Sequence, residues 1–278
     1  MRKINLVILS IIVWASCYGQ SKEEKEIVDE GKNLYKSEMA SWYGTDIFLS
    51  KFGDRRQNIG GYFSYLKNDR TTCVFFSKGE TPKIIGTFSF DSTYDVNTAI
   101  VDGEERESTK QEFDLLTIRQ AALKEYRTDS LFKSYKEMNP NFIPVIDEKG
   151  KRVYVVTGPQ KQGIVVLGND YLLTFDKDNK LKEKKRIHKS IIIIEYGNQD
   201  GKEILGAMHT HLPETGDLIT PTDICTLMLY QKEAKWAQHY VLSERNVSVW
   251  DCRGNQLTVM TKKAWEKIYN SQSDKKKK

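Results

Sequence analysis

The stretch that decides the fold of the C-terminal part of this chain reads Ile204-Leu-Gly-Ala-Met-His209-Thr-His211-Leu-Pro-Glu-Thr-Gly-Asp-Leu-Ile-Thr220-Pro-Thr-Asp223-Ile-Cys. Its apolar first part predicts a strand that ends in His-Thr-His, and a turn-rich loop follows. Because side chains alternate between the two faces of a strand, His209 and His211 point the same way. A helix is predicted to begin at Thr220, which places Asp223 in its first turn.

These three side chains have the chemistry of metal ligands. Two imidazoles about 7 Å apart along one strand face can share a single metal ion. Asp223 could supply a third, carboxylate ligand from the start of the helix. Three protein ligands and a water are typical of a catalytic zinc site, so the sequence predicts Zn²⁺ bound by His209, His211 and Asp223.

Asp223 also has a purely local explanation. Thr220 is a suitable N-cap, Pro221 suits the first helical position, and an acid three residues after the cap completes a capping box. This interpretation accounts for Asp223 without any metal. It does not account for two of the four histidines of the chain lying one residue apart on an apolar strand.

The motif resembles the JAMM signature of the JAB/MPN metalloprotein fold, in which His-x-His-Pro is followed by Ser-x-x-Asp at a helix start. The resemblance implies that His209, His211 and Asp223 are the zinc ligands. It also implies that Thr220 replaces the serine that helps to hold the oxyanion of the intermediate. The sequence departs from the JAMM signature at three points. Leu212 stands where Pro is usual, the loop is one residue longer, and Ser has become Thr. The resemblance covers at most residues 108–269.

A JAMM peptidase also needs a carboxylate that takes a proton from the metal-bound water, carried by a glutamate on an earlier strand. No residue matches that position closely. Asp170 fits the order of elements but has a shorter side chain. Glu195 ends an apolar isoleucine run, and its alternative interpretation is a strand-end residue turned to solvent. Glu214, in the loop, could reach the metal by proximity alone.

Residues 1–20 read as an export signal, with Arg2 and Lys3 before an apolar core and small residues after it. Ala-Ser-Cys resembles a bacterial lipobox, which would make Cys17 the lipidated first residue of a lipoprotein. Cleavage after Gly19 is the alternative. Either route takes the protein out of the cytoplasm, to the periplasm or to a lipid-anchored position on a membrane.

The formal charge of +5 gives little information about partners. Arg2, Lys3 and the four lysines of the tail carry this excess, and without them the net charge is −1. No basic stripe with interleaved aromatic residues is present, so a nucleic-acid partner is not expected. A peptide or protein substrate or partner is expected instead.

The sequence indicates no chemistry for the remaining cysteines and histidines. Cys73 and Cys225 lie in apolar runs and are expected in the core, and the odd number of cysteines after Cys17 leaves at least one thiol free. His188 lies in a basic segment and is expected in solvent. His239 is expected at the surface or in the core, unless its strand borders the metal site.

The order of elements predicts an α+β protein in two parts. Residues 21–105 are expected to form a small unit with one helix, ending near Gly44, and an antiparallel meander. Residues 106–270 are expected to form a JAB/MPN-like α/β/α domain with a mixed sheet, followed by the lysine-rich tail at 271–278. The expected elements of this domain are a broken helix from Ser108 to Met138, strands at 142–146, 152–157, 163–167, 171–175, 182–188 and 191–196, the His-Thr-His strand, a helix at 220–235, strands at 237–243, 247–250 and 256–260, and a helix at 262–269.

Together these patterns predict an exported zinc-dependent hydrolase that acts on peptide or isopeptide bonds. The alternative is a non-catalytic binding or scaffold protein of the cell envelope that keeps the fold and could keep the metal. The two differ in one feature, which is a carboxylate close enough to the metal to act on its water.

Overall fold

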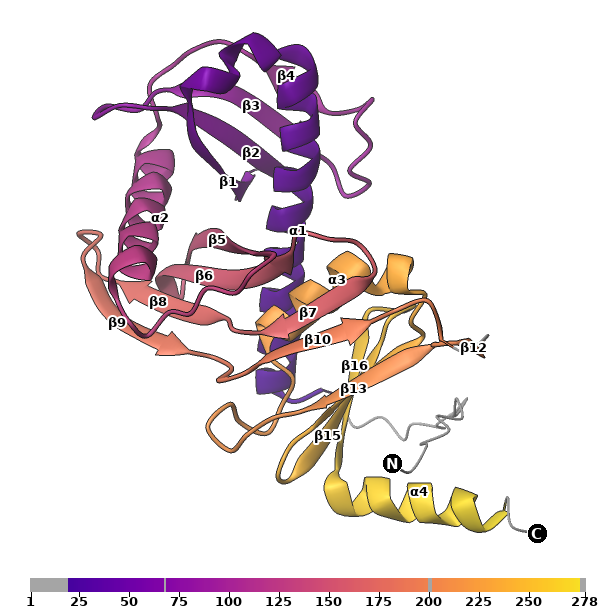
Figure 1. Ribbon diagram of the computed structural model, residues 1–278. Helices are drawn as coiled ribbons and strands as arrows, with labels where there is room; N and C mark the ends of the chain where they lie inside the picture. The colour runs from indigo at the N-terminus through magenta and orange to yellow at the C-terminus, as the bar shows by residue number, and fades with distance from the viewer. Residues whose placement is uncertain (1–19, 68, 200–201, 276–278) are drawn as a thin grey trace. The chain divides into compact units, whose positions relative to one another are not determined.

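The computed structural model describes residues 20–67, 69–199 and 202–275 of the chain. The predicted export signal, including Cys17, lies outside them except for Gln20, as does the end of the lysine tail. Helices and several mostly antiparallel sheets form an α+β fold, as the sequence predicted (Figure 1).

The helices are α1 (Lys22–Lys51), the 3₁₀ helix η1 (Gly53–Asn58), α2 (Lys110–Thr128), α3 (Pro221–Ala234) and α4 (Lys262–Lys275). The first nine strands are β1 (Ile59–Lys67), β2 (Arg70–Ser77), β3 (Ile84–Phe90), β4 (Ile100–Asp102), β5 (Met138–Asp147), β6 (Gly150–Pro159), β7 (Ile164–Gly168), β8 (Tyr171–Phe175) and β9 (Leu181–Arg186). The others are β10 (Ile191–Glu195), β11 (Asn198–Gln199), β12 (Lys202–Glu203), β13 (Gly206–Thr210), β14 (Gln238–Leu242), β15 (Asn246–Asp251) and β16 (Gln256–Thr261).

The chain divides into two compact units. Unit 1 contains residues 1–31, 163–165 and 192–278, and unit 2 contains residues 32–162 and 166–191. The predicted division near residue 105 does not coincide with this grouping. Both α2 and the sheet of β5, β6, β8 and β9 belong to unit 2 together with the N-terminal meander.

In unit 2 the meander β1-β2-β3-β4 is covered by a helix on each face. Side chains of β2 alternate, and Cys73 and Phe75 pack in one cluster with Phe48 of α1. Val74 and Phe76 point the other way, into a cluster with the α2 leucines at positions 115 and 116. Burial of both faces explains why β2 is apolar at almost every position.

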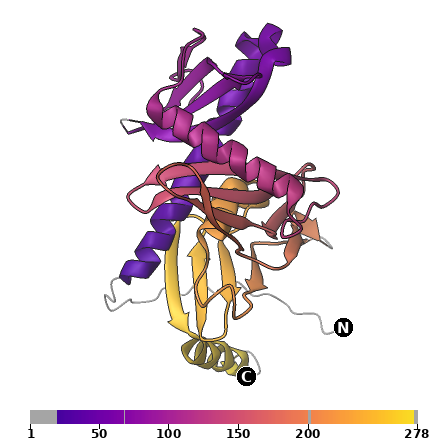
Figure 2. The same ribbon diagram turned by 90° about the vertical axis from the view of Figure 1, so that its left-hand side faces the viewer.

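A second antiparallel sheet of unit 2 has the order β5-β6-β8-β9. Helix α2 lies across it, with Ile118 and Ala122 packed against Val153, Val155 and Leu173 (Figure 2). The same helix contacts both sheets of this unit because its apolar residues cover more than one face. The lysines of β9 favour an edge position, since lysine discourages edge pairing, and β9 is an edge strand of this sheet.

Unit 1 is built on the mixed sheet β13-β14-β15-β16. Strands β13 and β14 are parallel and are joined through α3, while the other pairs are antiparallel. Helix α4 continues directly from the end of β16 (Figure 1) and extends beyond the predicted end at Tyr269. Strands β7 and β10 form a two-stranded sheet that contains points at which the chain passes from one unit to the other.

The predicted end of the first helix near Gly44 was wrong, because α1 continues to Lys51. A Cβ at Gly44 would lie 2.9 Å from Cβ and Sγ of Cys73, so the missing side chain lets the helix approach β2. This glycine serves packing and does not stop the helix.

Two other predictions, one about a helix and one about the burial of a strand, were wrong. The second part of the helix predicted to reach Met138 does not form, since α2 ends at Thr128 and β5 begins at Met138. The Asp129 carboxylate accepts a hydrogen bond from the Leu131 amide and pairs with Lys184, and no second helix starts there. The apolar run of β10 predicts a strand buried on both faces, but Ile193 is 53 % exposed.

Cys73 and Cys225 are buried in the core as predicted, and Cys252 is buried too. None of these three cysteines forms a disulfide within the described part of the chain. None of the helices formed by the described residues is long and apolar enough to cross a membrane.

Candidate metal centre

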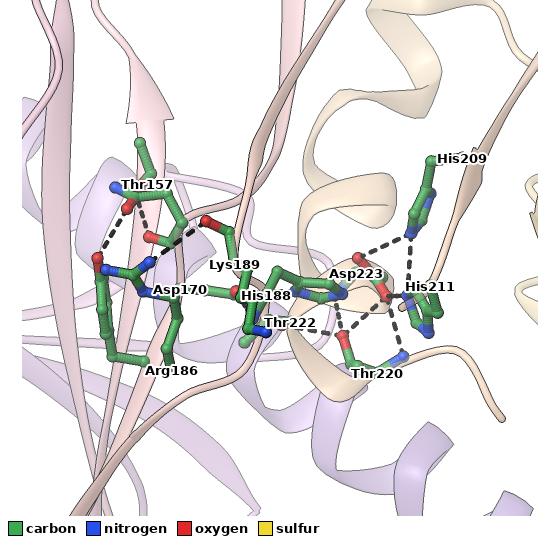
Figure 3. A network of polar contacts seen from close by, with 12 residues as sticks. Thr157, Asp170, Arg186, His188, Lys189, His209, His211, Thr220, Thr222 and Asp223 are labelled. Carbon is green, nitrogen blue, oxygen red and sulfur yellow. Dashed lines mark hydrogen bonds and ion pairs between the residues drawn. The ribbon is translucent and has the colours of Figure 1, made fainter. Parts of the chain in front are cut away.

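Strand β13 places both histidines of His-Thr-His on one face of the sheet. His209 pairs with Val241 of the parallel strand β14. The His211 amide donates to the Leu242 carbonyl at 2.8 Å, which holds the residue after β13 in line with the strand. Figure 3 shows the two imidazoles facing the start of α3.

The start of α3 places Asp223 through a complete capping box. The Thr220 amide donates to Asp223 Oδ2 at 3.0 Å, and the Asp223 amide donates to Thr220 Oγ1 at 3.1 Å. The Thr220 hydroxyl also donates to Asp223 Oδ2 at 2.8 Å. The local interpretation of Asp223 is therefore confirmed, and the same contacts aim its carboxylate at the histidines (Figure 3).

The three side chains converge within unit 1. Nε2 of His209 and Nε2 of His211 lie 3.0 Å apart. His211 Nε2 is 3.2 Å from Asp223 Oδ2, and His209 Nε2 is 3.6 Å from Asp223 Oδ1. Zinc bonds of about 2.0–2.1 Å at tetrahedral angles put neighbouring ligand atoms about 3.3 Å apart. The three distances, which involve both oxygens of the Asp223 carboxylate, lie on both sides of that value, so the side chains are close enough together to share one ion.

Burial and charge lead to the same conclusion. His209, His211 and Asp223 are 5 %, 6 % and 1 % exposed. A buried carboxylate is costly unless it is compensated by hydrogen bonds and opposite charge. A divalent cation would supply that charge, and nitrogen and carboxylate donors suit zinc. These residues could therefore hold a metal ion.

His239 lies in the core, one of its two expected places, and its strand β14 borders the predicted ligands, which was the condition for a part in the site. It is fully buried on β14, and its Nε2 lies 2.9 Å from His209 Nδ1. Burial, and then the neighbouring His209 ring, lower the pKa of His239 to about 3, so the imidazole is neutral at physiological pH. The available sequence signal was its place on the strand after the capped helix, which pairs with β13.

Thr220 is placed beside the predicted ligands, but its hydroxyl is engaged. It bonds Asp223 Oδ2 and lies 3.0 Å from the hydroxyl of Thr222. The role at an oxyanion that the resemblance implied stays a prediction.

Of the two predicted catalytic carboxylates, Glu195 belongs to unit 1, as the predicted ligands do. Glu195 ends β10 with its side chain exposed. Within the described part of the chain, no hydrogen bond or ion pair joins Glu195 to His209, His211 or Asp223.

Asp170 belongs to unit 2, where it is buried and holds a histidine (Figure 3). His188 Nδ1 lies 2.8 Å and 3.0 Å from the two carboxylate oxygens of Asp170, and the His188 amide donates to Oδ1 at 3.1 Å. The expectation that His188 is solvated was wrong, because its side chain is 8 % exposed. A basic sequence context does not reveal a buried carboxylate partner that comes from the turn between β7 and β8.

Comparisons of this chain with protein-family models, with curated proteins and with solved structures found no match.

Proposed function

We propose that this protein is a zinc-dependent hydrolase of the JAMM type that acts on peptide or isopeptide bonds. The observation that carries the proposal is the convergence of His209, His211 and Asp223 at 3.0–3.6 Å in a buried centre. Bound zinc would lower the pKa of its water toward neutrality and so supply a nucleophile. Two histidines and one carboxylate leave a fourth position for that water.

The elements around the ligands support this class. The His-x-His pair ends a strand, and the third ligand lies at the N3 position of a helix that leads into a parallel neighbouring strand. This is the order of parts that the JAMM resemblance requires, within a mixed sheet. The proposed setting is outside the cytoplasm, with a lipid on Cys17 as the proposed link to a membrane.

A non-catalytic zinc-binding or scaffold protein is the second candidate, and a separate observation favours it. The Thr220 hydroxyl is engaged in the helix cap. Glu195 is exposed, and Asp170 is bound to His188 in unit 2. A metal centre of this kind would bind zinc without an assigned proton acceptor.

The first test is elemental analysis of the purified mature protein and of a His209→Ala, His211→Ala double variant. We expect close to one zinc per chain in the parent and almost none in the double variant. Thr210→Ala is the matched control, because Thr210 lies between the two histidines with its side chain exposed. Equal zinc content in all three proteins, or none in the parent after zinc is supplied, would refute the metal centre.

Activity then separates the two candidates. Zinc-loaded parent and double variant are compared on a mixture of peptides and on isopeptide-linked substrates, with products identified by mass spectrometry. Cleavage by the parent alone supports the hydrolase. Stoichiometric zinc without cleavage of any substrate supports the binding or scaffold protein.

A further inference from the structure

His239 and His209 lie on the same face of the mixed sheet of unit 1. In the parallel pairing of β13 and β14, Ala207 lies opposite His239 and His209 lies opposite Val241. The two histidines are therefore diagonal neighbours, a relation in which long side chains can touch. Their ring centroids are 5.1 Å apart, and 2.9 Å separates His209 Nδ1 from His239 Nε2.

This contact bears on which nitrogen of His209 carries the proton. A neutral imidazole has one N–H and one lone pair, so a single proton lies between the two rings. If His239 Nε2 donates it, the proton of His209 sits on Nε2, which points at His211 and Asp223. If His209 Nδ1 donates it, His209 Nε2 presents a lone pair to those residues. Only the second arrangement makes His209 a metal ligand.

We propose that His239 is a positioning residue of the metal centre, which accepts the Nδ1–H of His209 and holds His209 in the tautomer that presents Nε2 to the metal. The inference rests on the zinc centre proposed above. A metal-binding histidine commonly donates its other ring N–H to an acceptor, which fixes the orientation of the ring. Here a neutral imidazole takes the place of the usual carboxylate or carbonyl.

The neighbours of His239 hold its ring in place and leave Nε2 to His209. Its ring stacks on Trp236 with centroids 5.6 Å apart and an interplanar angle of 29°. Its Nδ1 is buried and has no hydrogen-bond partner among the described residues. Among the described residues, the His239 ring makes one hydrogen bond, to His209, and when Nε2 accepts it the proton of the His239 ring sits on Nδ1.

The test compares zinc affinity in a matched pair of variants. His239→Gln can place a carbonyl oxygen near the position of Nε2 and keep the acceptor. His239→Leu removes the acceptor and leaves an apolar side chain in its place. We expect His239→Leu to weaken zinc binding about 10- to 100-fold, measured by competition with a chromogenic chelator. We expect His239→Gln to remain within about threefold of the parent, because the rescue depends on the acceptor.

A second measurement needs no variant. Nitrogen-15 NMR of the imidazoles in the zinc-loaded parent should show His209 protonated at Nδ1 and metal-bound at Nε2. Zinc bound through Nδ1 would overturn the inference. So would equal zinc affinity in parent and leucine variant, or equal weakening by both substitutions. Absence of zinc binding in the parent would instead refute the underlying metal centre, and the two failures are therefore distinguishable.

Discussion

At the scale of single residues, Asp223 combines two roles in one carboxylate. Its Oδ2 accepts from the amide and the hydroxyl of Thr220, which caps α3, and it also faces His211. Because the cap fixes the side chain by itself, less ordering would be needed for the proposed metal to bind. Helix capping would therefore favour the proposed metal binding, and the two explanations of Asp223 do not compete.

The first prediction concerns this cap. Thr220→Ala removes a hydroxyl that accepts from the Asp223 amide and donates to its carboxylate. We expect the free energy of unfolding to fall by about 1 kcal/mol, together with a measurable loss of zinc affinity. Thr220→Ser keeps the hydroxyl and should match the parent in both. Urea unfolding and zinc competition are the measurements, and an alanine variant equal to the serine variant in both would contradict the capping role.

At the scale of elements, the start of α3 depends on the first turns of α1. A Cβ at Gly31 would lie 2.7 Å from Ile224 Cβ and 2.9 Å from the Pro221 carbonyl oxygen. Ile224 and Pro221 lie one and two residues from Asp223 in the sequence. The position of Asp223, the proposed metal ligand, is thus set partly by a glycine almost 200 residues earlier in the chain, since only a residue without a side chain allows this approach.

The second prediction tests that approach. Gly31→Ala improves helix propensity, but its methyl group must displace Ile224 or the backbone of Pro221. We expect a net loss of about 1–3 kcal/mol in unfolding free energy, as for other overpacked sites. Gly53→Ala is the control, because nothing lies within 4 Å of a Cβ at that position. Similar unfolding curves for the two variants would show that α1 does not constrain α3.

At the scale of the whole molecule, stability against acid depends on a charged group buried in unit 2. Glu112 of α2 is fully buried, with Arg106 at 2.7 Å and Tyr65 Oη at 2.7 Å from Oε1. Burial by itself raises the pKa of Glu112, but bonds from Arg106, the Thr109 amide and Tyr65 outweigh it and lower the pKa to about 2. The ionised form is thus the one that the folded state prefers.

The third prediction follows from the sign of that shift. A carboxyl group whose folded pKa is depressed stabilises the fold above its unfolded pKa, near 4.5, and this stabilisation is lost as the pH falls toward about 2. The contribution is at most about 3 kcal/mol. Glu112→Gln should be less stable than the parent at pH 7 and show a flatter decline between pH 5 and pH 2.

Thermal unfolding across this pH range is the measurement for that prediction. Glu183→Gln is the control, since Glu183 is exposed on the edge strand β9 and should leave the profile close to that of the parent. An unchanged acid profile in Glu112→Gln would show that other groups govern the loss of stability in acid.

The sequence by itself determined the features that depend on neighbours along the chain. Strand-like apolar runs separated by turn residues predicted β1, β2 and β3. Alternation predicted the shared face of His209 and His211, and the Thr-Pro-Thr-Asp start predicted α3 with its cap. These signals are local, because the period of a strand and the bonds of a helix cap involve residues only a few positions apart.

Only the tertiary structure decided what depends on distant contacts. Gly44 lies inside a helix because Cys73 packs against it, and His239 meets His209 because β14 pairs with β13. His188 is buried because a carboxylate from the turn between β7 and β8, Asp170, meets it. In each case the deciding partner lies about 20 to 30 residues away, and neither composition nor periodicity reports which distant side chains will meet in the folded chain.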